Sequence, residues 1–482
     1  MRRVFLGVDC GTQSTKVVLR DPETGAVIAV GRAPHELVER DDGTREQDPD
    51  WWTRALRGAV RDAMRGERFE VGGIGVSAQQ HGLVCLDQSD RPVRAAKLWN
   101  DTTTARECEE LTRKIGGADR VRELTGNQFL PGYTAPKIVW LAAHEPASYA
   151  RTARMCLPHD YLNLWLTGEF ISEAGDASGT AYFDVRARRY SEAVLAAIDG
   201  ARDWERTLPT IAPSLSIIGT LRREAAESLG LEGAVPVSAG GGDNMIAAIG
   251  CDVVAQGPVA VSLGTSGTVF AYRDEPAVDP LGEAAAFCDS TGGWLPLAAT
   301  LNCTSATEWV RALFAMDHAD VDAAITREGA PGLSFLPYLS GERTPNRPEG
   351  AGVFVGMRSS HGRDEIVHAV VEGVTIGLAY ALDALRRTGV APTVVTLIGG
   401  GSASDPWAQL CADVFELPVV RPAFTEAAAS GAARQAQWAV ERRRPDLAPT
   451  SARRFEPRPR PELREAAERM AALREIARAN RL

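Results

Sequence analysis

The sequence predicts an α/β protein of two similar domains separated by a central cleft. The chain has 482 residues, too many for one hydrophobic core, so more than one domain is expected. A strand, a turn rich in Gly and Thr and a second strand occur at residues 3–21 and recur at 257–274. An internal repeat of this kind indicates a duplicated architecture. We therefore expect the two turns to line the space between the domains.

The composition is that of an ordinary globular protein, with 44% hydrophobic and 24% charged residues. The formal net charge of -10 argues against a broad basic face for nucleic acid. The 8 cysteines include no C-x-x-C pair, so neither a zinc site nor a disulfide framework is indicated. We expect reduced thiols, a cytoplasmic location and no nucleic-acid partner.

No segment indicates secretion or a membrane. The apolar run at the N-terminus is interrupted by Asp9, far short of a signal-peptide core. The longest apolar stretch, residues 373–385, is broken by Asp383, and we expect it to be too short to span a bilayer. A soluble protein without a membrane partner is predicted.

Strand and helix patterns alternate through both halves of the chain. Strands are predicted at 71–78, 82–87 and 393–401, and helices at 104–117, 135–146, 159–168 and 363–389. Glycines interrupt the pattern near the middle, so we divide the chain into domains 1–247 and 248–482. Residues 442–461 are rich in Pro and Arg and predict a connector, followed by a closing helix from about Glu462.

The first turn is a candidate phosphate site. Asp9 ends the strand before it, and residues 11–14 offer backbone N–H groups and hydroxyls to phosphate oxygens, with Lys16 as a nearby cation. A plain hairpin turn has a similar composition, but the second copy at residues 264–267 favours the phosphate role. Neither turn is a Walker P-loop, because the G-x-x-x-x-G-K-[ST] pattern is absent from the sequence.

Three further glycines, 399–401, follow a buried strand and precede a helix, with Asp405 expected as the N-cap and Pro406 at the first helical position. Their lack of side chains would let an adenine ring lie on the backbone. The alternative is a strand-to-helix turn that is packed closely for its own sake.

Asp243 stands directly after three glycines, 240–242, and before an apolar run. Glycines in that position suit a carboxylate that meets a ligand at close backbone approach, which makes Asp243 a candidate catalytic base. Gln79, Gln80 and His81 group hydrogen-bonding side chains where a strand ends, an arrangement that suits a polyol. A structural histidine is an equal alternative.

Two further patterns are ambiguous or discounted. Trp99, like Trp51 and Trp52, could belong to the core or to a site. A loose G-x-G-x-x-A at 73–78 resembles a dinucleotide fingerprint, but a strand follows it where a helix would be needed. A dehydrogenase is therefore disfavoured, and nicotinamide binding would be its signature.

Ten segments resemble the FGGY carbohydrate kinases, and among them the members that act on D-xylulose. In chain order they are GVDCGTQSTK, EQDPDWW, QQHG, LWND, TGNQFLPGYTAPK, HDYLNLWLTGEF, AGGGDN, SLGTSGT, FLPYLSGERTPNR and LIGGG. The resemblance covers nearly the whole chain. It implies a duplicated ribonuclease-H-like fold of the actin and hexokinase type, with ATP and sugar in the cleft.

The resemblance also implies roles for individual residues. Asp243 would be the catalytic base, and the sugar would contact Gln80, His81, Trp99, Asp243 and Asn244. ATP would contact Gly11, Thr12, Gln13, Lys16, Gly264, Thr265, Ser266, Gly400, Gly401 and Ser404. Asp9 and Asp243 would hold Mg²⁺. The chain departs from many bacterial members at Gln80, where they have Met, and residues 426–438 match the family's small-residue helix only loosely.

The expected reaction is the ATP-dependent phosphorylation of D-xylulose to D-xylulose 5-phosphate. A family member acting on another ketose, a polyol or a sugar acid is the near alternative, and an actin-like ATPase that acts on proteins is the distant one. QQHG together with GGGDN favours a sugar pocket over a peptide-binding module. The expected partners are the sugar and ATP, in a possible homodimer.

Overall fold

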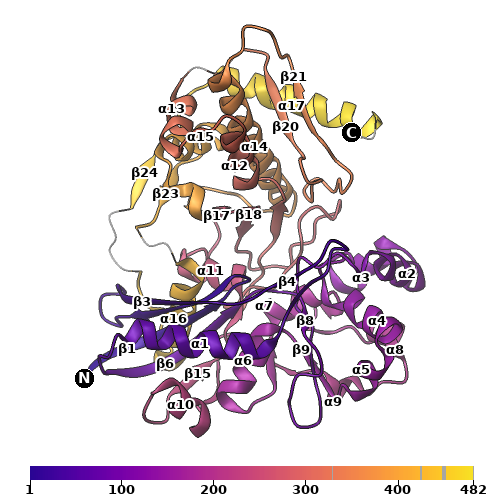
Figure 1. Ribbon diagram of the computed structural model, residues 1–482, viewed down its shortest axis with the longest axis vertical. Helices are drawn as coiled ribbons and strands as arrows, with labels where there is room; N and C mark the ends of the chain where they lie inside the picture. The colour runs from indigo at the N-terminus through magenta and orange to yellow at the C-terminus, as the bar shows by residue number, and fades with distance from the viewer. Residues whose placement is uncertain (328, 330, 424–425, 448–451, 481–482) are drawn as a thin grey trace.

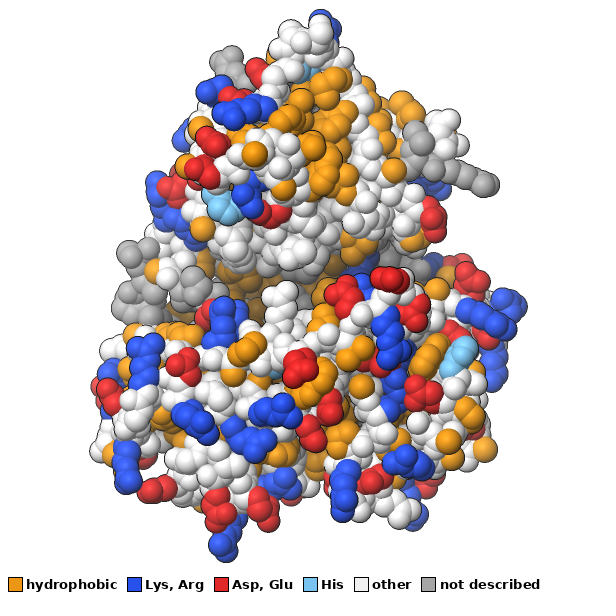
Figure 2. All heavy atoms as spheres, viewed as in Figure 1, with side chains coloured by type: hydrophobic (Ala, Val, Ile, Leu, Met, Phe, Trp, Pro, Cys, Tyr) orange, Lys and Arg blue, Asp and Glu red, His pale blue; other side chains and the backbone are white. Residues whose placement is uncertain are grey.

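The computed structural model describes residues 1–327, 329, 331–423, 426–447 and 452–480. The molecule has an N-terminal domain, in the lower part of Figure 1, and a C-terminal domain above it. Helices cover a central sheet in each domain. The face shown in Figure 2 is hollowed where the two domains meet.

The N-terminal sheet is built on the first predicted hairpin. β1 (Arg2–Cys10) pairs antiparallel with β2 (Ser14–Arg20) and parallel with β6 (Phe69–Ala78). The strand order is β14-β15-β6-β1-β2-β3, and β16 also pairs with β6. The other strands are β3 (Val27–Pro34), β14 (Ile217–Thr220), β15 (Pro236–Ser238) and β16 (Gly241–Gly242). The predictions of a hairpin at 3–21 and a strand at 71–78 are confirmed.

The C-terminal sheet repeats this arrangement with the order β19-β18-β17-β22-β23-β24. β17 (Pro258–Leu263) pairs antiparallel with β18 (Gly267–Ala271) and parallel with β22 (Val394–Ile398), as β1 does with β2 and β6. The remaining strands are β19 (Leu297–Thr300), β23 (Val419–Arg421) and β24 (Arg453–Phe455). The duplicated α/β fold predicted from the repeated hairpin is confirmed.

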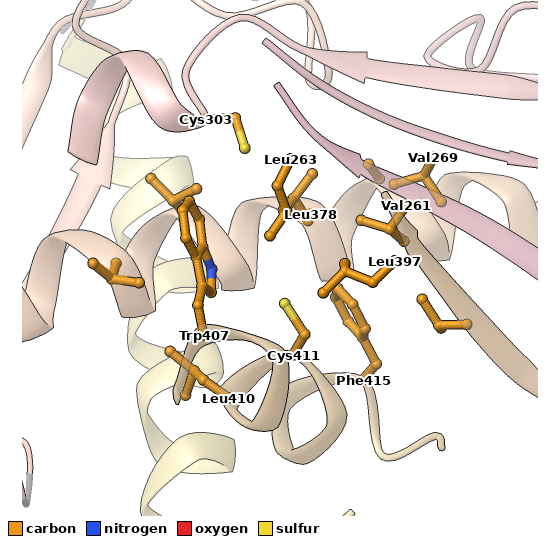
Figure 3. Packing of buried hydrophobic residues seen from close by; sticks show 14 of the residues in the cluster. Val261, Leu263, Val269, Cys303, Leu378, Leu397, Trp407, Leu410, Cys411 and Phe415 are labelled. Atoms are coloured by element: carbon orange, nitrogen blue, oxygen red, sulfur yellow. The ribbon is translucent and has the colours of Figure 1, made fainter. Parts of the chain in front are cut away.

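The core of the C-terminal domain lies between this sheet and two helices, α14 (Arg363–Arg387) and α15 (Asp405–Phe415). Figure 3 shows side chains of α15 directed at strand residues such as Val261 and Leu397, with Leu378 of α14 beside them. The indole of Trp407 donates to Thr375 Oγ1 at 3.0 Å, which satisfies its one polar atom inside the core.

The prediction that the apolar stretch at 373–385 is too short to span a bilayer was wrong as an argument from length, because the helix that contains it is longer. α14 has 25 residues and is long and apolar enough to cross a membrane by length and composition alone. However, 72% of its apolar window is buried inside the protein, because the helix packs against the sheet as a core element.

The predicted helices of the first half are present as α2, α4 and α6, and the closing helix is α17. The helices not yet given are α1 (Pro49–Met64), α2 (Ala105–Ile115), α3 (Ala118–Thr125), α4 (Thr134–His144), α5 (Pro146–Arg151), α6 (Pro158–Thr167), α7 (Ala174–Ala177), η1 (Ser178–Thr180), α8 (Glu192–Asp199), α9 (Trp204–Thr207), α10 (Arg223–Leu229), α11 (Asp243–Gly250), α12 (Thr304–Leu313), α13 (His318–Thr326), η2 (Gly400–Ala403), α16 (Ala427–Glu441) and α17 (Pro461–Asn480).

Short strands complete the structure. They are β4 (Val38–Glu39), β5 (Arg45–Gln47), β7 (Val84–Leu86), β8 (Ala96–Lys97), β9 (Arg154–Cys156), β10 (Ile171–Glu173), β11 (Phe183–Asp184), β12 (Arg189–Tyr190), β13 (Thr210–Ala212), β20 (Ser334–Pro337) and β21 (Gly352–Val355). β7 corresponds to the strand predicted at 82–87, and it pairs with β9 rather than with the central sheet.

α16 belongs to the second half of the sequence but packs on the N-terminal sheet, as Figure 1 shows. Glycines let the backbones meet directly: a Cβ at Gly7 would lie 1.9 Å from the carbonyl oxygen of Ala429, and one at Gly75 would lie 2.0 Å from that of Ala432. A Cβ at Gly431 would similarly lie 1.9 Å from the Ile246 carbonyl oxygen of α11. The division of the chain at residues 247 and 248 stays a prediction.

Two details differ from expectation. The stretch 442–461 is more than a connector, because it contains β24, which extends the C-terminal sheet beside β23; its residues 448–451 lie outside the described residues. The N-cap of α15 is Ser404, whose hydroxyl accepts a hydrogen bond from the Trp407 N–H at 3.1 Å, so Asp405 is the first helical residue. A serine hydroxyl fills this role as well as a carboxylate does.

Candidate active site

The first predicted phosphate turn joins β1 to β2 and is held by side chains from elsewhere in the N-terminal domain. Thr12 Oγ1 donates to Gln79 Oε1 at 3.1 Å and accepts from the Trp99 indole N–H at 3.0 Å. The side-chain amide of Gln47 donates to the Thr12 carbonyl oxygen at 2.7 Å. Gln13 at the tip is exposed. Trp99, predicted to contact sugar, thus braces the turn itself.

Asp9 and Lys16 face each other in the register of the β1–β2 hairpin. Burial raises the pKa of Asp9 to about 6, although the Lys16 ammonium lowers it, and Glu426 raises it further. Glu426 was not predicted from the sequence. Its carboxylate lies 2.6 Å from Lys16 Nζ and 3.2 Å from Arg32, just before α16 begins. The packing of α16 on the sheet brings this remote acid to the turn.

Asp243 is the first residue of α11 and is partly exposed. Its Oδ1 accepts from the backbone N–H of Asn244 at 2.8 Å and from Asn244 Nδ2 at 2.9 Å. Burial raises the pKa of Asp243 to about 7, and the charge of Asp9 raises it further, against the bonds from Asn244 that lower it. Desolvation therefore outweighs the helix N-terminus, which favours the charged form.

The glycines before Asp243 make room for protein atoms. A Cβ at Gly240, where φ is +72°, would lie 2.3 Å from the Val76 carbonyl oxygen, and one at Gly241 would lie 2.4 Å from Ser290 Oγ. At Gly242 the nearest atom would be Gln80 Cγ, at 2.7 Å. The glycines therefore allow side chains and strand backbone to approach closely. The close approach of a ligand, which the sequence suggested, stays a prediction.

Gln80, His81 and Asn244 gather beside Asp243. Asn244 Nδ2 donates to Gln80 Oε1 at 3.2 Å, whereas Gln80 Nε2 is buried and has no hydrogen-bond partner among the described residues. His81 Nδ1 donates to the Gly179 carbonyl oxygen at 2.7 Å. Burial, with the charges of Lys137 and Arg343, lowers the pKa of His81 to about 3, so the ring is neutral and its Nε2 can accept a hydrogen bond.

The second turn lies with the predicted adenosine residues in the C-terminal domain. The carbonyl oxygen of Gly264 accepts from the Thr304 N–H at 2.9 Å, and that of Thr265 accepts from the Ser305 N–H at 3.2 Å. The Thr265 side chain is exposed and Ser266 is half-buried. A Cβ at Gly401 would lie 2.9 Å from Leu263 Cβ, just before the turn.

Gly400 is exposed, and a Cβ there would meet no atom within 4 Å, so a flat ring could lie over it. The Ser404 hydroxyl, in contrast, is engaged by Asp322 and by its capping bond. Of the predicted ATP residues in this domain, Gly400 is therefore open, whereas Ser404 already has protein partners.

A buried charged cluster behind the glycines was missed by the sequence analysis. His159 Nδ1 lies 3.1 Å from Asp160 and 3.5 Å from Asp176, and its Nε2 donates to the Ala239 carbonyl oxygen at 2.6 Å. Although burial lowers the pKa of His159, bonds to both carboxylates raise it well above the usual value. The HDYLNLWLTGEF motif contains two of the three residues, but its spacing alone gave no sign of the third.

Comparison with known proteins completes this description. Residues 4–250 match the N-terminal domain of the FGGY family of carbohydrate kinases, and residues 259–440 match the C-terminal domain. The chain belongs to this family. It is therefore a sugar kinase, and the family implies ATP as its second substrate.

Named relatives cover almost all of the chain. It is 41% identical to a xylulose kinase of Haemophilus influenzae over 446 residues, 90% of each chain. It is 37% identical to a xylulose kinase of Escherichia coli, over 91% of this chain and 90% of the relative. A solved xyloylose kinase from Brucella ovis superposes with a TM-score of 0.92 at 35% identity, covering 99% of both chains.

Proposed function

We propose that this kinase transfers the terminal phosphoryl group of ATP to the primary hydroxyl at C5 of D-xylulose, giving D-xylulose 5-phosphate. The observation that carries the proposal is the hydrogen-bonded group of Asp243, Asn244 and Gln80 at the start of α11, with His81 next to Gln80 in the chain. It combines one carboxylate with several neutral hydrogen-bonding groups, as a polyhydroxy substrate requires. The choice of D-xylulose is supported by the names of the relatives.

Asp243 is the base in this proposal. The sugar hydroxyl must lose its proton during transfer, and a carboxylate with a pKa of about 7 is well matched to accept it near neutral pH. One oxygen of Asp243 is occupied by Asn244, which leaves Oδ2 for the hydroxyl. His81 Nε2 and Gln80 Nε2 are available to the other hydroxyl groups.

The two Gly-Thr turns, with Lys16, are proposed to hold the triphosphate, and Gly400 and Gly401 the adenosine end. The backbone N–H groups at the turns supply donors that need no reorganisation during the reaction. Because the Thr12 side chain already has partners, its contribution to ATP would come mainly from the backbone. The hydroxyl and the backbone N–H of Ser404 both have protein partners, so any contact of Ser404 with ATP would require these bonds to be shared.

The carboxylates of Asp9 and Asp243 are suitable in kind for holding Mg²⁺. From the described part of the chain, the Asp9 carboxylate accepts only a long 3.5 Å hydrogen bond from Ser77, and the charge of Asp9 raises the pKa of Asp243. Carboxylate oxygens are suitable ligands for Mg²⁺, which would neutralise charge on the phosphate oxygens when bound. The cytoplasmic location, the possible homodimer and the lack of nucleic-acid or membrane partners stay predictions.

One coupled ADP-release assay tests this function. The purified protein is given ATP and Mg²⁺ with D-xylulose, L-xylulose, D-ribulose, L-ribulose, glycerol or gluconate. We expect the highest kcat/KM with D-xylulose, and a product phosphorylated at C5 by NMR. A clear preference for another acceptor would reassign the substrate, and ADP release independent of every sugar would favour a non-sugar ATPase.

A further inference from the structure

We infer that Arg343, carried by the C-terminal domain, is a further sugar-binding residue, which reaches the His81 and Tyr133 side of the pocket and donates hydrogen bonds to sugar hydroxyl groups. This inference rests on the proposed function of the same pocket. The sugar contacts predicted from the sequence all lie in the first 244 residues. A sugar contact from the C-terminal domain, such as Arg343, was therefore not among them.

The loop that carries Arg343 is rigidly held. Glu342 is buried, and its Oε1 accepts from the N–H groups of Leu301 at 2.5 Å and Arg343 at 2.8 Å. Asn302 Nδ2 donates to Glu342 Oε2 at 3.2 Å. The backbones of Glu342 and Arg347 exchange two hydrogen bonds of 2.7 Å. The backbone at Arg343 is therefore held in a hydrogen-bonded turn in the connection between β20 and β21.

A bridging segment links this turn to the sugar pocket. Thr344 Oγ1 donates to the Glu283 carbonyl oxygen at 3.1 Å. Three residues later, Ala286 exchanges hydrogen bonds of 2.7 and 2.8 Å with the Asn127 side chain of the N-terminal domain. The Phe287 ring then lies 6.0 Å from the His81 ring. Figure 1 shows the β20–β21 connection extending toward the lower domain.

Charge at the pocket agrees with this placement. Burial is the main cause that lowers the pKa of His81 and raises that of Tyr133, and the positive charge of Arg343 acts on both rings. The His81 and Tyr133 rings are themselves only 4.6 Å apart. The charge of Arg343 therefore acts on the group that we propose to hold the sugar, and the contacts of Thr344 with Glu283 and of Phe287 with His81 join its loop to the same pocket.

The acids near Arg343 have other partners. The Glu283 carboxylate binds Tyr380 and Arg387, and the Glu342 carboxylate accepts the backbone and amide bonds described above. Over the described part of the chain, no Asp or Glu forms an ion pair with Arg343, which is half-buried. Arg343 interacts electrostatically with Glu342 but forms no ion pair with it, so its guanidinium keeps hydrogen-bond donors that the hydroxyl oxygens of a sugar can accept.

The test compares Arg343→Gln and Arg343→Lys with a matched control, Arg347→Gln. Arg347 lies in the same turn, but among the described residues its guanidinium bonds only to the neighbouring Asn346 carbonyl oxygen. KM for sugar and for ATP, kcat, sugar affinity by calorimetry and the melting temperature are measured for each. We expect Arg343→Gln to weaken sugar binding by about 10- to 100-fold, the loss typical of a charged hydrogen bond, while KM for ATP and the melting temperature stay unchanged.

Arg343→Lys should recover part of the sugar affinity, and Arg347→Gln should behave as the wild type. Unchanged sugar affinity in Arg343→Gln would overturn the inference, as would an effect confined to KM for ATP, which would instead place the guanidinium at the phosphates. If the acceptor panel reassigns the substrate, the variants are compared on the sugar that the wild type prefers, so the two proposals fail separately.

Discussion

At the scale of single residues, the site depends on the environment of Asp243. Asn244 fixes one carboxylate oxygen by two hydrogen bonds, while burial and Asp9 raise the proton affinity of the group. The sequence singled out this residue as a candidate base because it follows three glycines and precedes an apolar run. It could not predict the pKa, because the two other carboxylates that act on it come from β1 and α7.

Asp243→Asn should abolish most activity while preserving the fold. The amide keeps the shape and the bond from the Asn244 N–H but cannot accept the hydroxyl proton, so kcat should fall by about 100- to 10,000-fold. Steady-state kinetics with the proposed sugar and ATP measure this effect. Normal turnover in the variant would show that another group is the base.

The pH dependence follows from the raised pKa. As the proposed base, Asp243 can accept a proton only when it is deprotonated, so kcat/KM should be highest above pH 7 and should fall about tenfold per pH unit well below the pKa of about 7. A pH profile of kcat/KM measures this acidic limb. A limb near pH 4, the ordinary range for a carboxyl group, would contradict the environment described for Asp243.

Gly242→Ala tests why a glycine precedes the base. The new Cβ would lie 2.7 Å from Gln80 Cγ, so Gln80 must move away from its bond to Asn244. We expect a higher KM for sugar with little change in KM for ATP. Gly200→Ala is the control, because its Cβ would meet no atom closer than 3.5 Å. Equal kinetics in both variants would remove the role given to Gln80.

At the scale of elements, the sequence predicted the hairpins, β6, α14 and α17 well, because their patterns of apolar residues are strong and local. The packing of α16 on the N-terminal sheet could not be predicted in this way. Its small residues match the family helix only loosely, and its contacts with Gly7 and Gly75 join residues more than 300 positions apart. For the same reason the pairing of Lys16 with Glu426 was not foreseen.

Gly7→Ala should destabilise the protein by separating α16 from the sheet. Its Cβ would lie 1.9 Å from a helix carbonyl oxygen, and overpacking of this kind costs about 1–3 kcal/mol. Thermal or urea unfolding measures the loss. Gly377→Ala in α14 has open space around its Cβ and should be neutral or slightly stabilising. A Gly7→Ala protein as stable as the wild type would show that the helix can shift without cost.

At the scale of the whole molecule, the groups that we propose for catalysis come from both domains. Asp9 and Asp243 stand in the N-terminal domain, whereas Gly264, Thr265 and Gly400 stand in the C-terminal one. We expect the domains to close on the sugar, which excludes water and completes the site. ADP release should therefore be much slower without sugar than with it, as the coupled assay measures. Equal rates would contradict closure driven by the sugar.

The contact of α16 with the first sheet has a consequence for any attempt to divide the protein. A fragment ending near Gly250 would expose the bare glycine-lined backbone of β1 and β6, together with Phe5 and Val18, which Ala429 and Ala433 otherwise cover. Such a fragment would aggregate when produced alone and would become soluble only if the remaining chain were produced beside it. We therefore expect the two halves of the chain to fold as one unit, although each carries its own sheet.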